Sequence, residues 1–544
     1  MNEELRMKNE EFAAAPASAK LTHSSFLIPH SSSIMWLAVV GLTGLRLSLV
    51  GKGALAFVDE QRYVTAMLGL RALGEGHGRE FLQAINSMGA RPGDGLWRVI
   101  PGLGQAVLLL AFRLNPNAPP SLQVPQVFNV LILSLSAVLL YKIYRQFFSL
   151  GFALVGVALY SSLVNTNVYL RHLLPYDHAL FFFLLALWLL LTAPEATATR
   201  RQWVVGGLSG FSYAVYPGYF MGPAVLLALG VLLAVAPKLG AGHRLKQVRI
   251  GPVVAQLAGS VTVLVSLELL ARFSDTSYLA SSRYIATTVT QGSFTEGFSF
   301  VSTYFWQVEG WAGGSLLVLG GAGLGLSIRE FLRGPAPSSS GPTKPVVLTG
   351  LLVLGFVAWL GYAGLVQGAH QFVFYGRILH FFAPFIVLGA VAALQNIARR
   401  WPPGKPWLLA GGGAVALWHF GTFVTAYRAV AYPCDVVYAR GIHDARQIIS
   451  NQTTGCDNQL VTYRVFGPRI RGQRTTAEPR YRLVNFAYLY PLSCYRAAGT
   501  KGSEVVASVP YFMKYAPYQF EGHDAVQRMR LRDNPYEFQI LRAK

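Results

Sequence analysis

The stretch Val58-Asp-Glu-Gln-Arg-Tyr63 follows directly on the first long apolar segment of this 544-residue chain. Two adjacent carboxylates at the mouth of a membrane span are costly, and ionisable groups in such positions usually belong to a functional site. The stretch therefore predicts a membrane protein whose first span ends in an acidic, functional turn.

The composition of the whole chain supports a membrane protein. Hydrophobic residues make up 53% of the chain and charged residues 13%, whereas a soluble domain has about 25% charged residues. Long apolar runs recur throughout, which overrules the several soluble domains that the length alone would suggest. The net charge of +21 would indicate nucleic-acid binding in a soluble chain. Here many Lys and Arg residues fall in short loops, where they fix topology and meet anionic lipid. We expect a lipid bilayer and no nucleic acid as partner.

Eleven apolar runs approach the ~20 residues that a helix needs to cross a bilayer. The predicted spans are 34–57, 123–141, 150–168, 178–193, 203–216, 219–236, 251–270, 311–328, 346–366, 379–397 and 407–426. The polar segment 1–33 carries no cleavable signal and is predicted to be a cytoplasmic N-terminal arm. Residues 34–426 would form the transmembrane domain.

Residues 96–114 are long enough to span but contain Arg98, Pro101 and Arg113. If they crossed, the basic pair Lys142 and Arg145 would lie outside. If they lie in the outer interface, this pair and the later basic clusters all fall inside, so that five cytoplasmic loops obey the positive-inside bias. We therefore predict an outer interfacial loop over residues 58–122, with helices lying along the membrane surface.

Residues 427–544 are charged, rich in Tyr and free of spanning runs. Alternating apolar residues predict strands over 459–463 and 503–508, and 443–449 is predicted to be a helix. The fold class is thus an all-α polytopic membrane protein with about 11 spans and outer interfacial helices, plus a small α/β C-terminal domain on the outer side. Cys456 and Cys494 could form a disulfide there or remain two thiols.

With this topology, chemically versatile side chains gather at the outer ends of the spans. A carboxylate can accept a proton from a hydroxyl nucleophile, and Arg or His can hold a departing phosphate through charge-assisted hydrogen bonds. Together they predict transfer of a group from a membrane-held phosphate to an acceptor. The residues concerned are Asp59, Glu60, Arg171, His172, Asp177, His178, Arg377 and His380.

Four short motifs resemble those of GT-C glycosyltransferases, in particular the dolichyl-phosphate-mannose protein mannosyltransferases and bacterial aminoarabinose transferases (glycosyltransferase family 39-like). They share an order and a predicted side of the membrane. The motifs are Asp59-Glu-Gln-Arg-Tyr63, Phe112-Arg-Leu114, Leu174-Pro-Tyr-Asp177 and Tyr375-Gly-Arg377. Residues 34–260 carry most of the resemblance.

The resemblance implies a GT-C-like fold and an enzyme that moves a sugar from a polyprenyl-phosphate-linked donor to an extracytoplasmic acceptor, with inversion. Asp59 would be the base, with Glu60 and Asp177 as further catalytic residues that shape the acceptor site or hold a metal. Arg377 would bind the donor phosphate. No cofactor is firmly implied, and a divalent metal is left open.

The remaining site residues are assigned less directly. Arg98, Arg171 and His380 would assist Arg377 at the donor phosphate. Where family members often have a basic residue before Pro-Pro-Leu-Tyr, the chain has Ile100-Pro-Gly-Leu-Gly104, and Arg98 and Trp97 could replace the missing basic and aromatic residues. The residues expected to bind the acceptor are Arg62, Tyr63, His172 and His178.

Each assignment has a structural alternative. Asp59 and Glu60 could simply favour the first turn of a helix, Asp177 could be an N-cap, and Arg377 could be an interfacial anchor. A multi-span transporter and a non-catalytic envelope assembly protein are the alternatives to an enzyme. The bacterial inner or plasma membrane is the expected location, with the endoplasmic reticulum as alternative.

Overall fold

A computed structural model gives the structure of most of the chain. The residues that it describes are 31–56, 58–64, 66–87, 95–115, 117–192, 198–239, 250–284, 297–333, 344–372, 374, 376–444, 446–453, 460–466, 480–485, 503–511 and 536–543. Cys456, Cys494, Tyr375 and most of the N-terminal arm lie outside these ranges.

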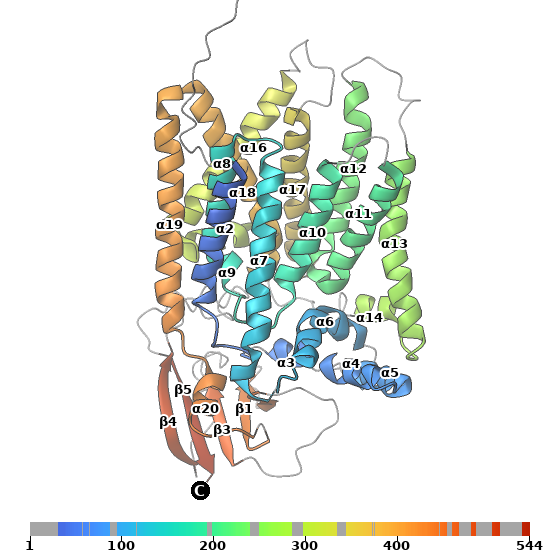
Figure 1. The fold of residues 1–544 in the computed structure, drawn as a ribbon, viewed down its shortest axis with the longest axis vertical. Helices are drawn as coiled ribbons and strands as arrows, with labels where there is room; N and C mark the ends of the chain where they lie inside the picture. The colour runs from blue at the N-terminus through green and yellow to red at the C-terminus, as the bar shows by residue number, and fades with distance from the viewer. Residues whose placement is uncertain are drawn as a thin grey trace, which may run out of the picture.

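Long helices form a bundle that occupies the upper part of Figure 1. Each of the 11 predicted spans falls on one of them. Within the described residues, seven helices are long and apolar enough to cross a membrane, namely α7, α12, α13, α16, α17, α18 and α19. The bundle consists of α2 (Ser31–Leu47), α7 (Gln123–Tyr144), α8 (Leu150–Ser162), α10 (Tyr176–Leu191), α11 (Ala198–Val215), α12 (Met221–Leu239), α13 (Gly251–Arg272), α16 (Gly310–Leu332), α17 (Lys344–Gln367), α18 (Gly376–Arg400) and α19 (Lys405–Ala429).

Two predicted spans are shorter in the structure. The first helix ends at Leu47 rather than near residue 57, because Gly51 and Gly53 adopt positive φ angles that a helix does not accommodate. The third breaks at Leu163, whose extended backbone separates α8 from the short α9 (Val164–Asn167). The polar residues of α9 are buried and bonded inside the bundle, so this segment turns within the protein instead of continuing as a lipid-facing helix.

Short helices cover one end of the bundle, beside the strands (Figure 1). We call this the sheet end. The helices there include α3 (Val58–Val64), α4 (Ala66–Gly74), α5 (Gly78–Ser87), α6 (Gly95–Ala111), α14 (Tyr278–Tyr284) and α20 (Pro433–Ala439). The ambiguous segment 96–114 therefore lies across the sheet end as α6 and does not run through the bundle, as predicted. The other short helices are α15 (Gly297–Gln307), η1 (Pro119–Leu122), η3 (Pro217–Tyr219) and η6 (Pro402–Gly404).

Helix α3, which carries the acidic pair, packs tightly on α6. A Cβ atom at Gly102 of α6 would collide with the backbone carbonyl of Tyr63 in α3. Glycine therefore allows the two backbones to approach. This contact fixes Asp59 and Glu60 against the sheet end of the bundle.

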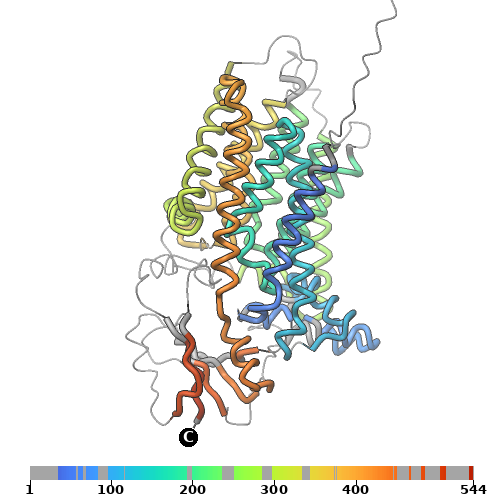
Figure 2. The backbone as a smooth tube through the Cα atoms, turned by 60° about the vertical axis from the view of Figure 1, so that its left-hand side comes forward, coloured from blue at the N-terminus to red at the C-terminus, as the bar shows by residue number. Residues whose placement is uncertain are grey.

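The C-terminal part forms a five-stranded mixed sheet in the order β2-β1-β3-β5-β4, in which β1 and β3 are parallel and the other neighbours antiparallel. Ile448, Leu483 and Ile540 from three of the strands are buried. Figure 2 shows the chain passing from α19 through α20 into this sheet. The strands are β1 (Ile448–Thr453), β2 (Leu460–Arg464), β3 (Tyr481–Asn485), β4 (Ser503–Tyr511) and β5 (Tyr536–Ala543).

The sheet confirms the strands predicted over 459–463 and 503–508, and the small α/β part of the fold class. The helix predicted over 443–449 is wrong. Asp444 accepts a hydrogen bond from the backbone N–H of Arg446 (2.9 Å), a local turn that competes with helix formation. Ile448 and Ile449 then enter β1, where the apolar pair packs in a sheet.

The segment after α2 is fastened to α20. Asp435 Oδ2 accepts the backbone N–H of Gly53 (2.8 Å), and the Cys434 thiol donates to the carbonyl of Ala54 (3.0 Å). Burial raises the pKa of Asp435 to about 6, although the Gly53 N–H and the charges of Arg171 and Lys52 oppose the rise. The first loop and the C-terminal part therefore meet at a carboxyl group that is easier to bury when protonated.

We expect Asp435→Asn to stabilise the protein at pH 7.5. The folded-state pKa lies above the unfolded value, so the folded chain binds the proton more tightly and stability falls as pH rises from about 4 through about 6. At neutral pH the cost amounts to about 2 to 3 kcal/mol. Asparagine still accepts the Gly53 N–H but carries no charge. Thermal unfolding in detergent should show a higher Tm for the variant at pH 7.5 and none of this advantage at pH 4. An equal difference at both pH values would contradict a titration effect.

Candidate active site at the sheet end

Three helices bring a carboxylate, two guanidinium groups and a phenol together at the sheet end. Arg377, in the first turn of α18, donates from Nη1 to the hydroxyl of Tyr176 (2.7 Å) and lies 3.7 Å from Asp59 Oδ2. Arg62 Nη1 lies 3.0 Å from the other oxygen, Asp59 Oδ1. The side chains of Asp59 and Arg377 are 30% and 15% exposed. We call these four residues the Asp59–Arg377 cluster; its carboxylate and its Arg377 guanidinium are partly exposed, whereas Tyr176 is buried.

The position of Arg377 is not explained by helix stability. The N-terminus of a helix carries a partial positive charge and favours acids, which suits Asp59 in α3 and Asp177 in α10. An arginine in the first turn of the 25-residue α18 goes against this preference. Its guanidinium therefore needs negative or polar partners, which Asp59 and Tyr176 supply in this structure.

Glu60 points away from the open side of the cluster. Its side chain is fully buried, accepts the backbone N–H of Leu173 at Oε1 (2.6 Å) and lies 3.4 Å from His172 Nδ1. His172 in turn packs edge-on against Tyr432 near α20. Glu60 thus ties α3 to the turn that leads into α10, and His172 lies in this buried contact instead of lining the open face.

Behind the cluster lies a second, buried pair. His380 Nε2 lies 3.0 Å from Asp177 Oδ1, and His380 Nδ1 lies 3.2 Å from the carbonyl oxygen of Asn165. Asp177 is adjacent in sequence to Tyr176, and His380 lies one turn beyond Arg377. The pair therefore joins the first turns of α10 and α18, next to Tyr176 and Arg377, which contact each other.

Arg171 does not join the predicted donor site. Its guanidinium donates to the carbonyl oxygens of Leu49 (2.5 Å) and Tyr427 (2.7 Å) and stacks on the ring of Tyr427, with 4.1 Å from Cζ to the ring centroid. It fastens the ends of α2 and α19 together. A sequence pattern cannot separate such a buried arginine from one that a ligand can reach, since both lie at the same end of the spans.

Two other predicted residues, Tyr63 and His178, are placed away from the open face. Tyr63 is buried where α3 meets α6. His178 is buried and stacks on Phe128, with ring centroids 5.4 Å apart. The backbone of Arg98 belongs to α6, but its side chain lies outside the described part of the structure.

Sequence reasoning missed Tyr176, Asn165, Glu309 and His419. Tyr176 stands inside the Leu174–Asp177 motif, so the motif itself carried the signal. Glu309 directly precedes an apolar run, as Asp59 follows one, and His419 interrupts a predicted span. Glu309 and His419 are buried with 2.8 Å between Oε2 and Nε2. Isolated ionisable groups within or beside spans were thus the overlooked signal.

The metal site left open by the sequence requires several ligands close together. Within the described ranges, no group of three or more His, Cys, Asp and Glu side chains is arranged to hold a metal ion. Carboxylate–imidazole pairs are present at Glu60–His172 and Asp177–His380. Both pairs are buried.

No family model matches the sequence, and no curated protein matches it. Among solved structures, the chain is similar to ArnT from Cupriavidus metallidurans bound to undecaprenyl phosphate, with 11% sequence identity and a TM-score of 0.49, over 94% of this chain and 97% of that chain. It is also similar to the oligosaccharyltransferase of Archaeoglobus fulgidus in the apo form, with 11% identity and a TM-score of 0.43, over 75% of this chain and 57% of that chain.

Proposed function

We propose that this chain is an integral membrane glycosyltransferase that moves a sugar from a polyprenyl phosphate to a hydroxyl of an extracytoplasmic acceptor. The observation that carries the proposal is the Asp59–Arg377 cluster, in which a partly exposed arginine at the head of a membrane helix lies 3.7 Å from a partly exposed carboxylate. The positive-inside pattern of the loops supports an extracytoplasmic sheet end and a cytoplasmic N-terminus.

In the proposed mechanism, the donor phosphate replaces Asp59 as the anionic partner of Arg377. Tyr176 keeps its hydrogen bond to the guanidinium and so holds it in place. The released Asp59 carboxylate accepts the proton of the acceptor hydroxyl as the hydroxyl oxygen attacks the anomeric carbon. The bond from that carbon to the phosphate oxygen breaks, and its electron pair remains on the phosphate next to Arg377. Attack opposite the leaving group inverts the anomeric centre.

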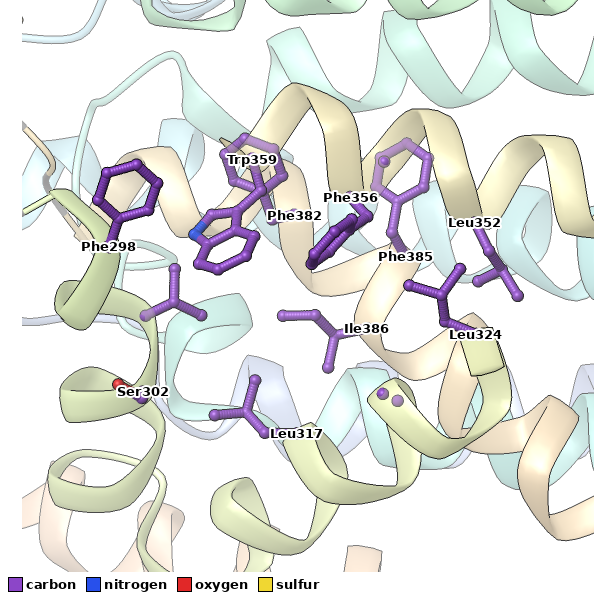
Figure 3. Close-up of a pocket in the computed structure, with 14 residues that line it drawn as sticks. Phe298, Ser302, Leu317, Leu324, Leu352, Phe356, Trp359, Phe382, Phe385 and Ile386 are labelled. Carbon is purple, nitrogen blue, oxygen red and sulfur yellow. The ribbon is translucent and has the colours of Figure 1, made fainter. Parts of the chain in front are cut away.

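An apolar cavity gives the lipid tail of this donor a place to lie. It encloses about 320 Å³ between α15, α16, α17 and α18 (Figure 3). Phe385 and Ile386 of α18 line it, eight and nine residues beyond Arg377, which is about 12 Å along the helix. Phe298 and Phe356, also in its wall, are exposed on the bundle surface. A phosphate at Arg377 could therefore be continued by a prenyl chain that leaves toward the bilayer.

We expect Ile386→Trp to fill part of this cavity and weaken the binding of undecaprenyl phosphate about tenfold. Geranyl phosphate, whose chain is too short to reach far along α18, should bind the variant and the wild type equally. Leu417→Trp places the same indole on an exposed position of α19 and serves as control. Titration by intrinsic fluorescence quenching in detergent measures each affinity. Equal loss for both lipids would place the tail elsewhere.

The proposed reaction can be tested without knowing the acceptor. The purified chain in nanodiscs would be given a panel of undecaprenyl-phosphate-linked sugars together with total envelope lipids and glycans, and the release of undecaprenyl phosphate would be measured by mass spectrometry. Release with at least one donor, dependent on the acceptor fraction, is the expected result. Passage of intact donor across proteoliposomes without cleavage would instead support the transporter alternative.

A further inference from the structure

A fully buried carboxylate lies outside the Asp59–Arg377 cluster. Glu309, at the start of α16, accepts the backbone N–H of Val164 at Oε2 and that of Asn165 at Oε1, both at 2.8 Å. His419 Nε2 of α19 lies 2.8 Å from Oε2. A buried charge is costly unless it is fully hydrogen-bonded, and Glu309 satisfies this with three partners. It thereby clamps the first residues of α9 between α16 and α19.

Asn165, the residue held by this clamp, makes further contacts to the start of α18 and to Tyr304 of α15. Its Nδ2 donates to the carbonyl oxygen of Gly376 (2.8 Å) and to the hydroxyl of Tyr304 (3.1 Å). Its own carbonyl oxygen faces His380 Nδ1 at 3.2 Å. Gly376 immediately precedes Arg377, and His380 contacts Asp177. The backbone and the side chain of one clamped residue thus both act on the first turn of α18.

We propose that Glu309 is a positioning residue for the donor site: through Asn165 it fixes the first turn of α18 and so sets the places of Arg377 and His380. This inference rests on the proposed function. Glu309 touches neither Arg377 nor Asp59 in any described contact, so its effect is transmitted through α9. A shift of about 1 Å in a group that positions a substrate can cost up to two orders of magnitude in rate.

The other end of α16 offers a control carboxylate, Glu330, which is partly exposed and lies 4.0 Å from Arg399 Nη1. Glu330, near the end of α16, accepts a hydrogen bond from Asn396 Nδ2 of α18 (2.7 Å). Glu330→Gln makes the same chemical change at a carboxylate that links α16 to α18. It lies at the end of the bundle remote from Arg377, so it reports on helix packing without touching the first turn of α18.

Glu309→Gln keeps the size of the side chain but puts an NH₂ group in the place of one carboxylate oxygen, so the backbone N–H of either Val164 or Asn165 loses its acceptor. We expect undecaprenyl phosphate to bind about tenfold more weakly, and peptides covering residues 376–383 to exchange amide hydrogens faster. Glu330→Gln should change neither. His419→Ala removes one partner and leaves the carboxylate in place, so it should show the same changes to a smaller extent even if the glutamine variant does not fold.

The two measurements separate the two proposals. If the wild type does not bind undecaprenyl phosphate, the proposed function fails and the positioning role fails with it. If the wild type binds and the exchange of residues 376–383 is unchanged in both Glu309→Gln and His419→Ala, the clamp is refuted and the function stands. A purely structural Glu309 would lower the melting temperature while the folded fraction bound lipid normally, and that result also overturns the proposal. Asn165→Ala combined with Glu309→Gln should add little to either single effect, since both act through one path.

Discussion

Asp59→Asn is expected to lower turnover about 1,000-fold while donor binding persists. General-base catalysis contributes roughly 10² to 10⁴ in rate, and asparagine cannot accept the proton that the attacking hydroxyl gives up. The variant has nearly the same shape, and the ion pairs it loses are partly exposed and stabilise the fold by about 1 kcal/mol or less. Undecaprenyl phosphate should bind the variant slightly more tightly, because a negative charge 3.7 Å from Arg377 has been removed.

A fall in turnover together with an unchanged or slightly higher affinity for undecaprenyl phosphate is the result that identifies Asp59 as the general base. Turnover is measured as released undecaprenyl phosphate per folded enzyme, and binding by titration with the lipid phosphate alone. Asp275→Asn provides the control, since Asp275 is an exposed aspartate in the turn after α13, at a positive φ angle that asparagine tolerates. Normal turnover in Asp59→Asn would rule out the base assignment, and an equal loss in the control would point to a general effect on the protein.

The membrane architecture was predictable because it depends on composition over long windows. Eleven apolar runs anticipate 11 helices of the bundle, and the loop charges correctly keep α6 out of it. Composition averaged over long windows does not predict the structure where a few polar contacts determine the path of the backbone. The break at Leu163 and the buried α9 depend on Glu309, which lies 145 residues away from Val164, and nothing local to either residue predicts that they meet.

The sequence predicts which site residues lie on the same side of the membrane, but not which of them contact each other. Asp59 and Arg377 meet because both follow or precede spans at the same end, and the sequence places them there. Which arginine a ligand can reach is a matter of local bonding: the buried Arg171 donates to the carbonyl oxygens of Leu49 and Tyr427, whereas Arg377 is partly exposed and contacts the side chains of Asp59 and Tyr176. Such a distinction depends on backbone oxygens brought from distant helices, and residue type carries no information about them.

Arg377→Ala is expected to weaken the binding of undecaprenyl phosphate about 100-fold. Hydrogen bonds to charged groups contribute about 1.5 to 3 kcal/mol each, and a guanidinium can make two of them to one phosphate. Lysine supplies charge without the planar pair of donors, so Arg377→Lys should recover only part of the loss. Arg428→Ala is the matched control: Arg428 is an exposed arginine near the end of α19 that donates to Ser48 Oγ, and its loss should leave lipid binding unchanged.

The short distance between Asp59 and Arg377 also predicts how the double variant binds undecaprenyl phosphate. Once Arg377 is gone, the Asp59 carboxylate faces the donor phosphate without the cation that lay 3.7 Å from it, and the two negative charges repel each other. Adding Asp59→Asn to Arg377→Ala should therefore restore part of the affinity for undecaprenyl phosphate, although turnover stays abolished for lack of a base. If Arg377 were only an interfacial anchor, neither the single loss nor its partial recovery would occur. A double variant that binds as weakly as Arg377→Ala would show that phosphate and Asp59 do not compete for the same guanidinium.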